Sequence, residues 1–523
     1  MAKSRHDASE EQTGSAEHRQ SGEHAGGGMG MRGVTRPMHE SHDHGMSDSQ
    51  RSEMLRMHHQ QTLWVYWTIL LVGVWILLSP VTFGYGKAMV VPSGERGVWF
   101  SSLTHDELRA TLMTFSDVAS GLLLLVFGWR ALRPNRPVSL WVCCFVGVWL
   151  NVAPVLFWAP TAAAYLNGTI AGALLIALTI LIPGMPNMIM YMQMGPPTPP
   201  GWSYNPSSWP QRWIMIVTGF AGWIVSRYLA AFQLGYIDQI WEPFFGQGTR
   251  QVLNSDMSHM WPISDASLGA LAYTFEFLMG YMGSPARWRT MPWMVAFFGI
   301  LVIPLGLTHI VLVISQPVVV GHWCTLCLLA AAIMLPMIPL EVDEVVAMGQ
   351  HMIDAKRRGD RGGSLWTIFW KGGQADDCTA DERSPELMQL PERPGRVFVA
   401  SIWGMSFPWT LIATSAIGIW LMFAPTVFAL QQSTETFDAA DVMHLGGALI
   451  LTTAVIAMGE VLRLGRFLNV VLALLVIGLP WLLTGGDTAS HINNAVCGIA
   501  VILLSIPRGP KQETYGRWDR FVR

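Results

Sequence analysis

The sequence carries little charge for its length, since only 13% of its 523 residues are Asp, Glu, Lys or Arg. Soluble domains average about 25%. Hydrophobic residues make up 51% of the chain, and the mean hydropathy is +0.35. This balance excludes an ordinary soluble protein and predicts a polytopic membrane protein. The net charge of −3 offers no basic surplus, which argues against a nucleic-acid partner.

The sequence also has few cysteines and no apolar stretch among its first 60 residues. Six cysteines are too few for a disulfide scaffold, so each is judged singly. The first 60 residues are polar, so we expect no signal peptide and expect the first span to direct insertion.

Residues 1–61 are predicted to form a disordered tail rich in His and Met. Eight of the fifteen histidines lie here: His6, His18, His24, His39, His42, His44, His58 and His59. Imidazole and thioether groups suit copper or nickel, but an ordinary solvated tail is the alternative. We assign no metal site.

Twelve apolar runs follow, each near the ~20 residues needed to cross a bilayer. They lie at about 63–84, 112–131, 139–159, 165–184, 212–236, 266–282, 291–315, 322–340, 404–429, 438–460, 466–484 and 489–507. They predict an all-α polytopic membrane protein with about twelve transmembrane helices. The expected domains are the tail, helical hairpins (62–185), a linker (186–210), a four-helix bundle (211–341), a linker (342–400), further hairpins (401–509) and a basic tail (510–523).

The placement of Lys and Arg predicts the orientation. Basic loops such as "RALRPNRP" and "DAKRRGDRGG" fall on one side if both termini are cytoplasmic. The loop 237–265 and a Cys-x-x-Cys motif then lie on the periplasmic side of a bacterial inner membrane, which is oxidising. After the bundle, "EVDEVVAM" is expected to extend the preceding helix. The basic and aromatic segment "KRRGDRGGSLWTIFWKGG" either lies on the anionic inner leaflet or is an ordinary linker.

A short motif recurs in the two hairpin regions: "GVWILLSP" (Gly73–Pro80), "GVWLNVAP" (Gly147–Pro154), "GIWLMFAP" (Gly418–Pro425) and the worn "IGLPWLL" (Ile477–Leu483). The next helix opens with a polar residue five before a glycine, at Ser116/Gly121, Asn167/Gly172, Asp441/Gly446 and Asn493/Gly498. The pattern resembles the SPW-repeat membrane family, whose unit is a two-helix hairpin. We expect these repeats to act as a scaffold.

Cys324 and Cys327 stand at the start of the apolar run 322–340. Three residues apart on the first turn of a helix, they are close enough to form a disulfide. The exposed N–H groups and dipole of that turn favour a thiolate, the electron-donating form. The motif therefore suggests redox chemistry, with two ordinary buried cysteines as the alternative.

Three segments of the central region resemble the vitamin K epoxide reductase family: "VLNS" (252–255), "SDASLGALAY" (264–273) and "CTLCL" (324–328). The resemblance implies a four-helix bundle that couples thiol oxidation to reduction of a membrane quinone, menaquinone or ubiquinone. It implies that Cys327 faces the quinone and that Cys324 exchanges with an outside thiol. A periplasmic thioredoxin-like dithiol protein is the expected partner.

The same resemblance puts Asp265 where the family commonly has an amide near a quinone carbonyl, with Tyr273 two turns further on. Asp265 could equally cap its helix together with Ser264. His322 is a candidate for moving the proton in thiol–quinone exchange. His309 is either a second polar group near the quinone or a satisfied interhelical histidine, and His259 is a weaker candidate.

Two intramembrane charges, Arg227 and Glu276, are expected to pair with each other. The family's full thiol relays carry a second cysteine pair in the outer loop, which this chain lacks, with Thr249 near one expected position. The other cysteines are Cys143, Cys144, Cys378 and Cys497. The sequence thus predicts a thiol:quinone oxidoreductase, with a non-catalytic quinone-binding or scaffold protein as the alternative. A transporter is not favoured, because no pair of broken helices with ion ligands is evident.

Overall fold

The computed structural model describes residues 48–86, 106–134, 136–180, 196–374, 377–430 and 436–522. Most of the histidine-rich tail lies outside this part, so both interpretations of its histidines stay predictions. The expected disorder of residues 1–61 is wrong for the last 14 residues, because Asp48–Gln61 form a helix. His59 is described, and its Nε2 lies 2.9 Å from the carbonyl oxygen of Leu132. The His59 Nε2 atom therefore contacts the chain itself at hydrogen-bond distance.

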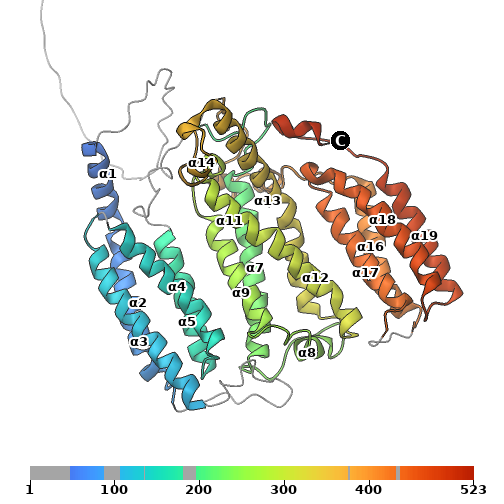
Figure 1. The fold of residues 1–523 in the computed structure, drawn as a ribbon, viewed down its shortest axis with the longest axis horizontal. Helices are drawn as coiled ribbons and strands as arrows, with labels where there is room; N and C mark the ends of the chain where they lie inside the picture. Colours follow the sequence, from blue (N-terminus) through green and yellow to red (C-terminus); the bar gives the residue numbers. More distant parts are fainter. Residues whose placement is uncertain are drawn as a thin grey trace, which may run out of the picture. The chain divides into compact units, whose positions relative to one another are not determined.

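The described chain is built of helices that follow the apolar runs (Figure 1). The N-terminal region contains α1 (Asp48–Gln61), α2 (Leu63–Thr82), α3 (Asp106–Ala131), α4 (Pro137–Leu156) and α5 (Ala162–Ile180). The central region contains α7 (Trp209–Gln233), α8 (Gly248–Leu253), α9 (Asp265–Gly280), α10 (Arg287–Thr290), α11 (Pro292–Val302), α12 (Pro304–Val319) and α13 (Thr325–Arg358). After it come η2 (Asp360–Gly363), α14 (Leu365–Lys371), η3 (Leu387–Gln389), α15 (Pro394–Ser401), α16 (Trp409–Val427), α17 (Ala439–Ile456), η4 (Glu460–Phe467), α18 (Leu468–Gly478), η5 (Leu479–Leu482), α19 (Thr488–Ser505) and η6 (Gly516–Arg520).

The prediction of an all-α polytopic membrane protein is confirmed. Among the described residues, 11 helical segments are long and apolar enough to cross a membrane. The twelfth expected helix is α9, which has only 16 residues. The run expected at 291–315 is divided at Ile303, because Pro304 has no N–H to continue the helix.

Helix α13 is the longest, with 34 residues, or about 51 Å at 1.5 Å per residue. That exceeds the ~30 Å hydrocarbon core, so one end extends beyond it. The expected extension of this helix through "EVDEVVAM" is thus confirmed. It stops where Gly359 adopts a left-handed conformation (φ 81°).

The hairpins are joined by exchanged tryptophan hydrogen bonds. The Trp75 indole of α2 donates to Asn167 of α5 at 2.6 Å, and the Trp149 indole of α4 donates to Ser116 of α3 at 2.9 Å. Each hairpin therefore gives a donor to the other. In the C-terminal region Trp420 of α16 donates to Asn493 of α19 at 2.8 Å.

Glycines let the two helices of each hairpin meet closely. A Cβ on Gly121 would lie 2.9 Å from the Gly73 carbonyl oxygen. In the third hairpin the glycine that meets Gly418 is Gly447, where a Cβ would lie 2.7 Å from the Gly418 oxygen. Gly446, the glycine of the recurring sequence pattern in this helix, faces Val476 instead.

The expected Arg227–Glu276 pair is wrong. The Arg227 guanidinium donates to Asn151 Oδ1 of α4 at 3.0 Å and to the Tyr165 hydroxyl of α5 at 3.3 Å. It therefore joins α7 to the N-terminal hairpins. Glu276 is fully buried, and within the described part of the chain neither carboxyl oxygen has a hydrogen-bond partner. Depth along two helices could be judged from the sequence, but rotation about each axis could not.

Candidate functional site

The Cys-x-x-Cys motif lies at the N-terminus of α13. Cys324 is the N-cap, and its sulfur accepts a hydrogen bond from the Cys327 backbone N–H at 3.1 Å. The two cysteines form a disulfide with their Cα atoms 5.2 Å apart. The predicted closeness of the two sulfurs is confirmed.

Apolar side chains from four helices enclose the disulfide. Cys324 is 0% and Cys327 7% exposed. The surrounding cluster consists of Leu229 and Phe232 of α7, Val252 and Leu253 of α8, Val313 of α12 and Leu326 of α13. An apolar wall with a few polar groups nearby is the kind of site that holds a flat, lipid-soluble ring.

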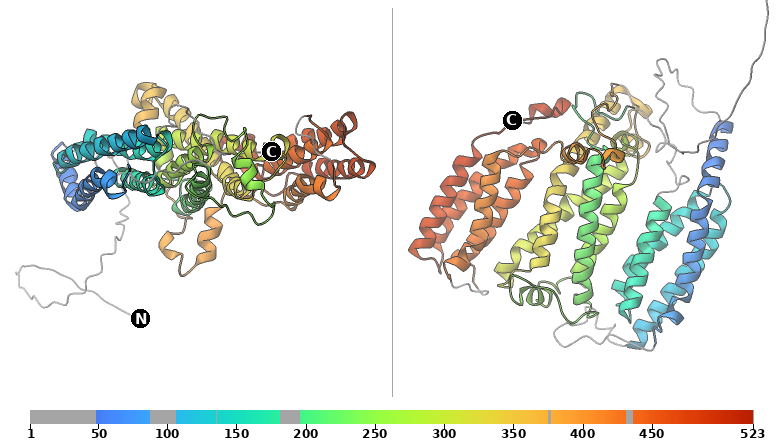
Figure 2. Two further views of the ribbon diagram at one scale, coloured as in Figure 1. Left: turned by 90° about the horizontal axis from the view of Figure 1, so that it is seen from below. Right: turned by 180° about the vertical axis from the view of Figure 1, so that it is seen from behind.

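The short helix α8 covers the disulfide. Its first residue, Gly248, packs so closely that a Cβ there would lie 2.1 Å from the Trp323 carbonyl oxygen. Figure 2 shows, in its right-hand view, the loop with α8 across the lower ends of the central helices. Only glycine allows this approach to the residue that precedes Cys324.

Glu242 joins this loop to the Cys-x-x-Cys turn. Its carboxylate accepts hydrogen bonds from the backbone N–H groups of Thr249 (3.2 Å) and Thr325 (3.1 Å) and from both threonine hydroxyls. It also accepts from the N–H groups of Phe244 and Phe245, each at 3.1 Å. Partial burial acts to raise the pKa of Glu242, but the hydrogen bonds outweigh it and lower the pKa to about 2. The sequence analysis missed Glu242.

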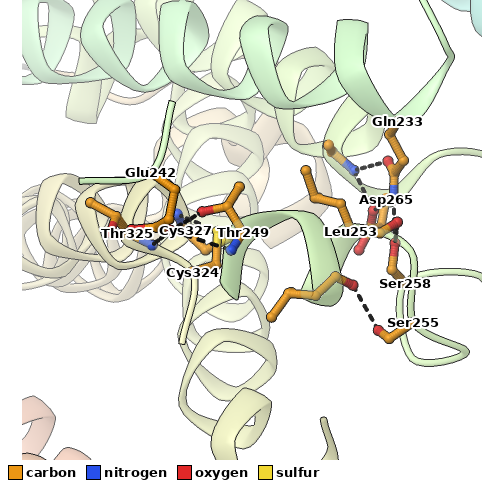
Figure 3. The surroundings of a disulfide bond; sticks show 12 residues. Gln233, Glu242, Thr249, Leu253, Ser255, Ser258, Asp265, Cys324, Thr325 and Cys327 are labelled. Carbon is orange, nitrogen blue, oxygen red and sulfur yellow. Dashed lines mark hydrogen bonds between the residues drawn. A yellow bond between two sulfur atoms is a disulfide. The ribbon is translucent and has the colours of Figure 1, made fainter. Parts of the chain in front are cut away.

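Asp265 lies at the start of α9, close to the α8 end of the site (Figure 3). Its Oδ1 accepts from Gln233 Nε2 at 2.5 Å and from the Ala266 N–H at 2.7 Å. Ser264 is the helix N-cap, with its hydroxyl oxygen accepting from the Ser267 N–H at 3.1 Å. Ser264 also donates to Gln233 Oε1. Gln233, on α7, is thus a second residue that the sequence analysis missed.

Helix α8 is fastened near Asp265 as well. The Ser258 hydroxyl donates to the Leu253 carbonyl oxygen at 3.0 Å and accepts from Gln233 Nε2. The Leu253 side chain packs in one cluster with Cys324 and with Ala266, the residue after Asp265. Figure 3 shows Leu253 between the disulfide and Asp265. The two ends of α8 are therefore held by Glu242 and by the Gln233–Ser258 contact.

Tyr273 and His309 lie deeper in the bundle. The Tyr273 hydroxyl donates to the Ala330 carbonyl oxygen of α13 at 3.1 Å, and the ring is buried. The His309 imidazole of α12 meets the Tyr273 ring edge-on, with centroids 6.2 Å apart. These two candidates therefore contact each other, as the pattern did not specify.

The remaining candidate histidines lie at the surface end. His322 is exposed, two residues before Cys324. His259 has its Nδ1 2.9 Å from the Ser255 carbonyl oxygen. Between His322 and Cys324, Trp323 is buried against the C-terminal helices, with its ring 5.6 Å from Phe423 and 5.7 Å from His444.

The cysteines outside the motif do not join it. Cys143, Cys144 and Cys497 are free thiols, and Cys378 packs against a different cluster from the one around Cys324. Cys497 of α19 packs with Leu421 and Ile450, in a different cluster from Cys324. Where a relay cysteine was expected, Thr249 binds Glu242 instead.

Comparison with known proteins agrees with these features. The model of the vitamin K epoxide reductase family matches residues 213–342, and that of the SPW repeat domain matches residues 408–507. No curated protein and no solved structure was found to match the chain. The chain contains a vitamin K epoxide reductase family domain followed by an SPW repeat domain.

Proposed function

We propose that the protein is a membrane thiol:quinone oxidoreductase whose reacting pair is Cys324 and Cys327. The observation that carries the proposal is the disulfide at the start of α13, inside an apolar cluster with Asp265 nearby. The matched domain supports membership of a family of quinone-linked thiol oxidoreductases. The acceptor is menaquinone or ubiquinone.

The reaction balances within the site. The reduced pair loses two electrons and two protons, and an S–S bond forms while the quinone becomes a quinol. Cys327 faces the quinone and Cys324 is the sulfur that exchanges with an outside dithiol. His322, exposed beside Cys324, takes up and returns a proton during that exchange.

The polar groups near the pair orient the quinone. Asp265, in its protonated form, donates a hydrogen bond to one carbonyl of the ring, and Ser264 contacts the same end. Both are held by Gln233 and lie next to Ala266 of the apolar cluster. Tyr273 and His309 line the deeper side. Leu253 must move from between the disulfide and Asp265 for the ring to enter.

The pair is then reduced by a partner. A periplasmic thioredoxin-like dithiol protein attacks Cys324 directly, because the loop has no cysteine of its own. This requires an inner-membrane protein with cytoplasmic termini and the Cys-x-x-Cys turn on the periplasmic side. The orientation follows from the Lys/Arg placement in the loops.

Reoxidation of the reduced pair tests the proposal. Purified protein in liposomes is reduced, freed of reductant under argon, and mixed with a short-chain ubiquinone or menaquinone. We expect one quinol per disulfide formed, and the same result for Cys143→Ser/Cys144→Ser. If Cys324 and Cys327 remain free thiols with both quinones, the proposed oxidoreductase function is excluded.

The alternative function is a quinone-binding or scaffold protein without turnover. One observation favours it: Glu242 and Thr249 occupy the loop where a thiol relay would operate, and they fasten α8 over the disulfide. In that case quinone would bind and protect Cys324 from alkylation, but no quinol would form.

A further inference from the structure

Glu242 is the charged group most directly attached to the Cys-x-x-Cys turn, and the proposed reaction gives it no role. Its carboxylate binds the N–H of Thr325, the first residue of α13. It also receives the Thr325 hydroxyl. The Cys324 sulfur accepts a hydrogen bond from the Cys327 N–H in the same first turn. Two groups that can carry negative charge therefore share one helix end.

The exposed N–H groups of a helix N-terminus and its dipole stabilise a nearby anion. A cysteine at such a position ordinarily becomes a thiolate easily. Here a carboxylate already occupies the Thr325 N–H. A second anion on Cys324, which is buried, would meet like-charge repulsion from the half-buried Glu242. The arrangement therefore opposes the thiolate that the helix end would otherwise favour.

We propose that Glu242 is a positioning residue of the redox centre, whose negative charge disfavours the Cys324 thiolate and so favours the disulfide over the reduced pair. This inference rests on the proposed function for its purpose, since a pair that gives up electrons readily suits quinone reduction. When the reduced form of a dithiol is stabilised, the pair becomes more oxidising, and the reverse holds here.

The carboxylate also fixes the geometry of the site. Because Glu242 binds Thr249 of α8 and Thr325 of α13 together, the charge cannot move away from Cys324 while α8 is in place. The lowered pKa of Glu242 keeps that charge present at neutral pH. The Glu242 charge and the packing of α8 therefore both act on the Cys324–Cys327 pair.

The test measures the dithiol–disulfide equilibrium of the full-length protein in detergent, without quinone, against a glutathione or dithiothreitol buffer. At a pH above the wild-type midpoint of Cys324 alkylation, we expect Glu242→Gln to shift the equilibrium about tenfold toward the dithiol, or about 30 mV to more positive potential. We also expect the pH midpoint of Cys324 alkylation to fall by about one unit.

Two further variants separate charge from structure. Asp256→Asn removes the same charge from an exposed position in the same loop and should leave both values unchanged. Glu242→Asp keeps the charge and should stay within about threefold of the wild-type equilibrium. The inference is overturned if Glu242→Gln behaves like Asp256→Asn, or if Glu242→Asp shifts as far as Glu242→Gln. Because no quinone takes part, these outcomes are independent of whether turnover occurs.

Discussion

At the scale of single residues, Glu242 also predicts how the site responds to acid. Its pKa in the folded protein, about 2, lies below the ordinary value of 4.5, so the folded state favours its ionised form. The stabilisation is therefore fully present above about pH 4.5 and is lost as the pH falls through about 2. We expect hydrogen-exchange protection of the Thr249 and Thr325 amides, corrected for intrinsic rates, to stay constant from pH 7 to 5 and to decline below that. Glu242→Gln should abolish this pH dependence, and a decline that persists in it would assign the effect to another group.

Asp265 gives a second prediction at this scale. In Asp265→Asn the amide oxygen can still accept from Gln233 and Ala266, and the new N–H₂ can donate to a quinone carbonyl. We expect its KM for quinone to stay within about threefold of the wild type. Asp265→Ala should raise KM about tenfold, as the loss of one hydrogen bond of about 1.4 kcal/mol would. Steady-state quinol formation measures both, and equal KM values for the two variants would remove Asp265 from the site.

Among the elements, α8 packs against the disulfide, and we expect it to limit access to the bond. In Gly248→Ala the added Cβ would lie 2.1 Å from a backbone oxygen of Trp323, so α8 must move. We expect a phosphine to reduce the Cys324–Cys327 disulfide about tenfold faster, measured by alkylation and gel shift. Gly349→Ala is the matched control, because a Cβ there, on α13 itself, meets nothing within 4 Å. Similar rates in Gly248→Ala and the wild type would mean that α8 does not limit access.

The elements also show where the sequence was sufficient. Apolar runs located the helices because each must satisfy its own backbone in the bilayer. The Cys-x-x-Cys turn was placed correctly because spacing within one turn is local. Glu242 and Gln233 could not be found this way. Glu242 reads as an ordinary loop carboxylate, and its contact with Thr325, 83 residues away, exists only after the loop folds back.

The repeats illustrate the same limit. Their exchanged tryptophan bonds need a Trp on one hairpin and a polar residue on the other, and three of four places have both. At the fourth place the tryptophan position, five residues before Pro480, is Leu475. The partner position, five residues before Gly447, is Val442. Both changes remove a polar group, so no donor or acceptor is left behind. The pairing across hairpins was not visible until the structure brought them together.

At the scale of the whole molecule, the central and C-terminal regions are held together by contacts at both ends of the central helices. At the end away from the disulfide, the Tyr515 hydroxyl donates to Glu460 at 3.0 Å, and Gln350 of α13 donates to the Tyr515 carbonyl oxygen at 3.0 Å. The last segment of the chain therefore joins α13 to the C-terminal hairpins. The C-terminal hairpins also pack on α12 and α13 through α17.

At the disulfide end, Phe423 of α16 contacts both the Cys-x-x-Cys turn and the loop that covers it. Its ring lies 6.0 Å from Phe245 of the loop and 5.6 Å from Trp323. Phe245 receives its position partly from Glu242, which accepts its N–H. The SPW repeat domain therefore packs against the Cys-x-x-Cys turn and its loop through the Phe423 ring.

Phe423→Ala tests whether this packing stabilises the Cys-x-x-Cys turn. Loss of the ring removes the packing of Phe245 and Trp323, so we expect α8 to loosen and the disulfide to be reduced by a phosphine about threefold to tenfold faster. Trp409→Ala, which removes an exposed aromatic side chain from the first residue of the same helix, is the matched control and should not change the rate. Thermal unfolding of both variants shows whether the fold as a whole is weakened. If the reduction rate of Phe423→Ala equals that of Trp409→Ala, the C-terminal hairpins do not stabilise the Cys-x-x-Cys turn through this ring.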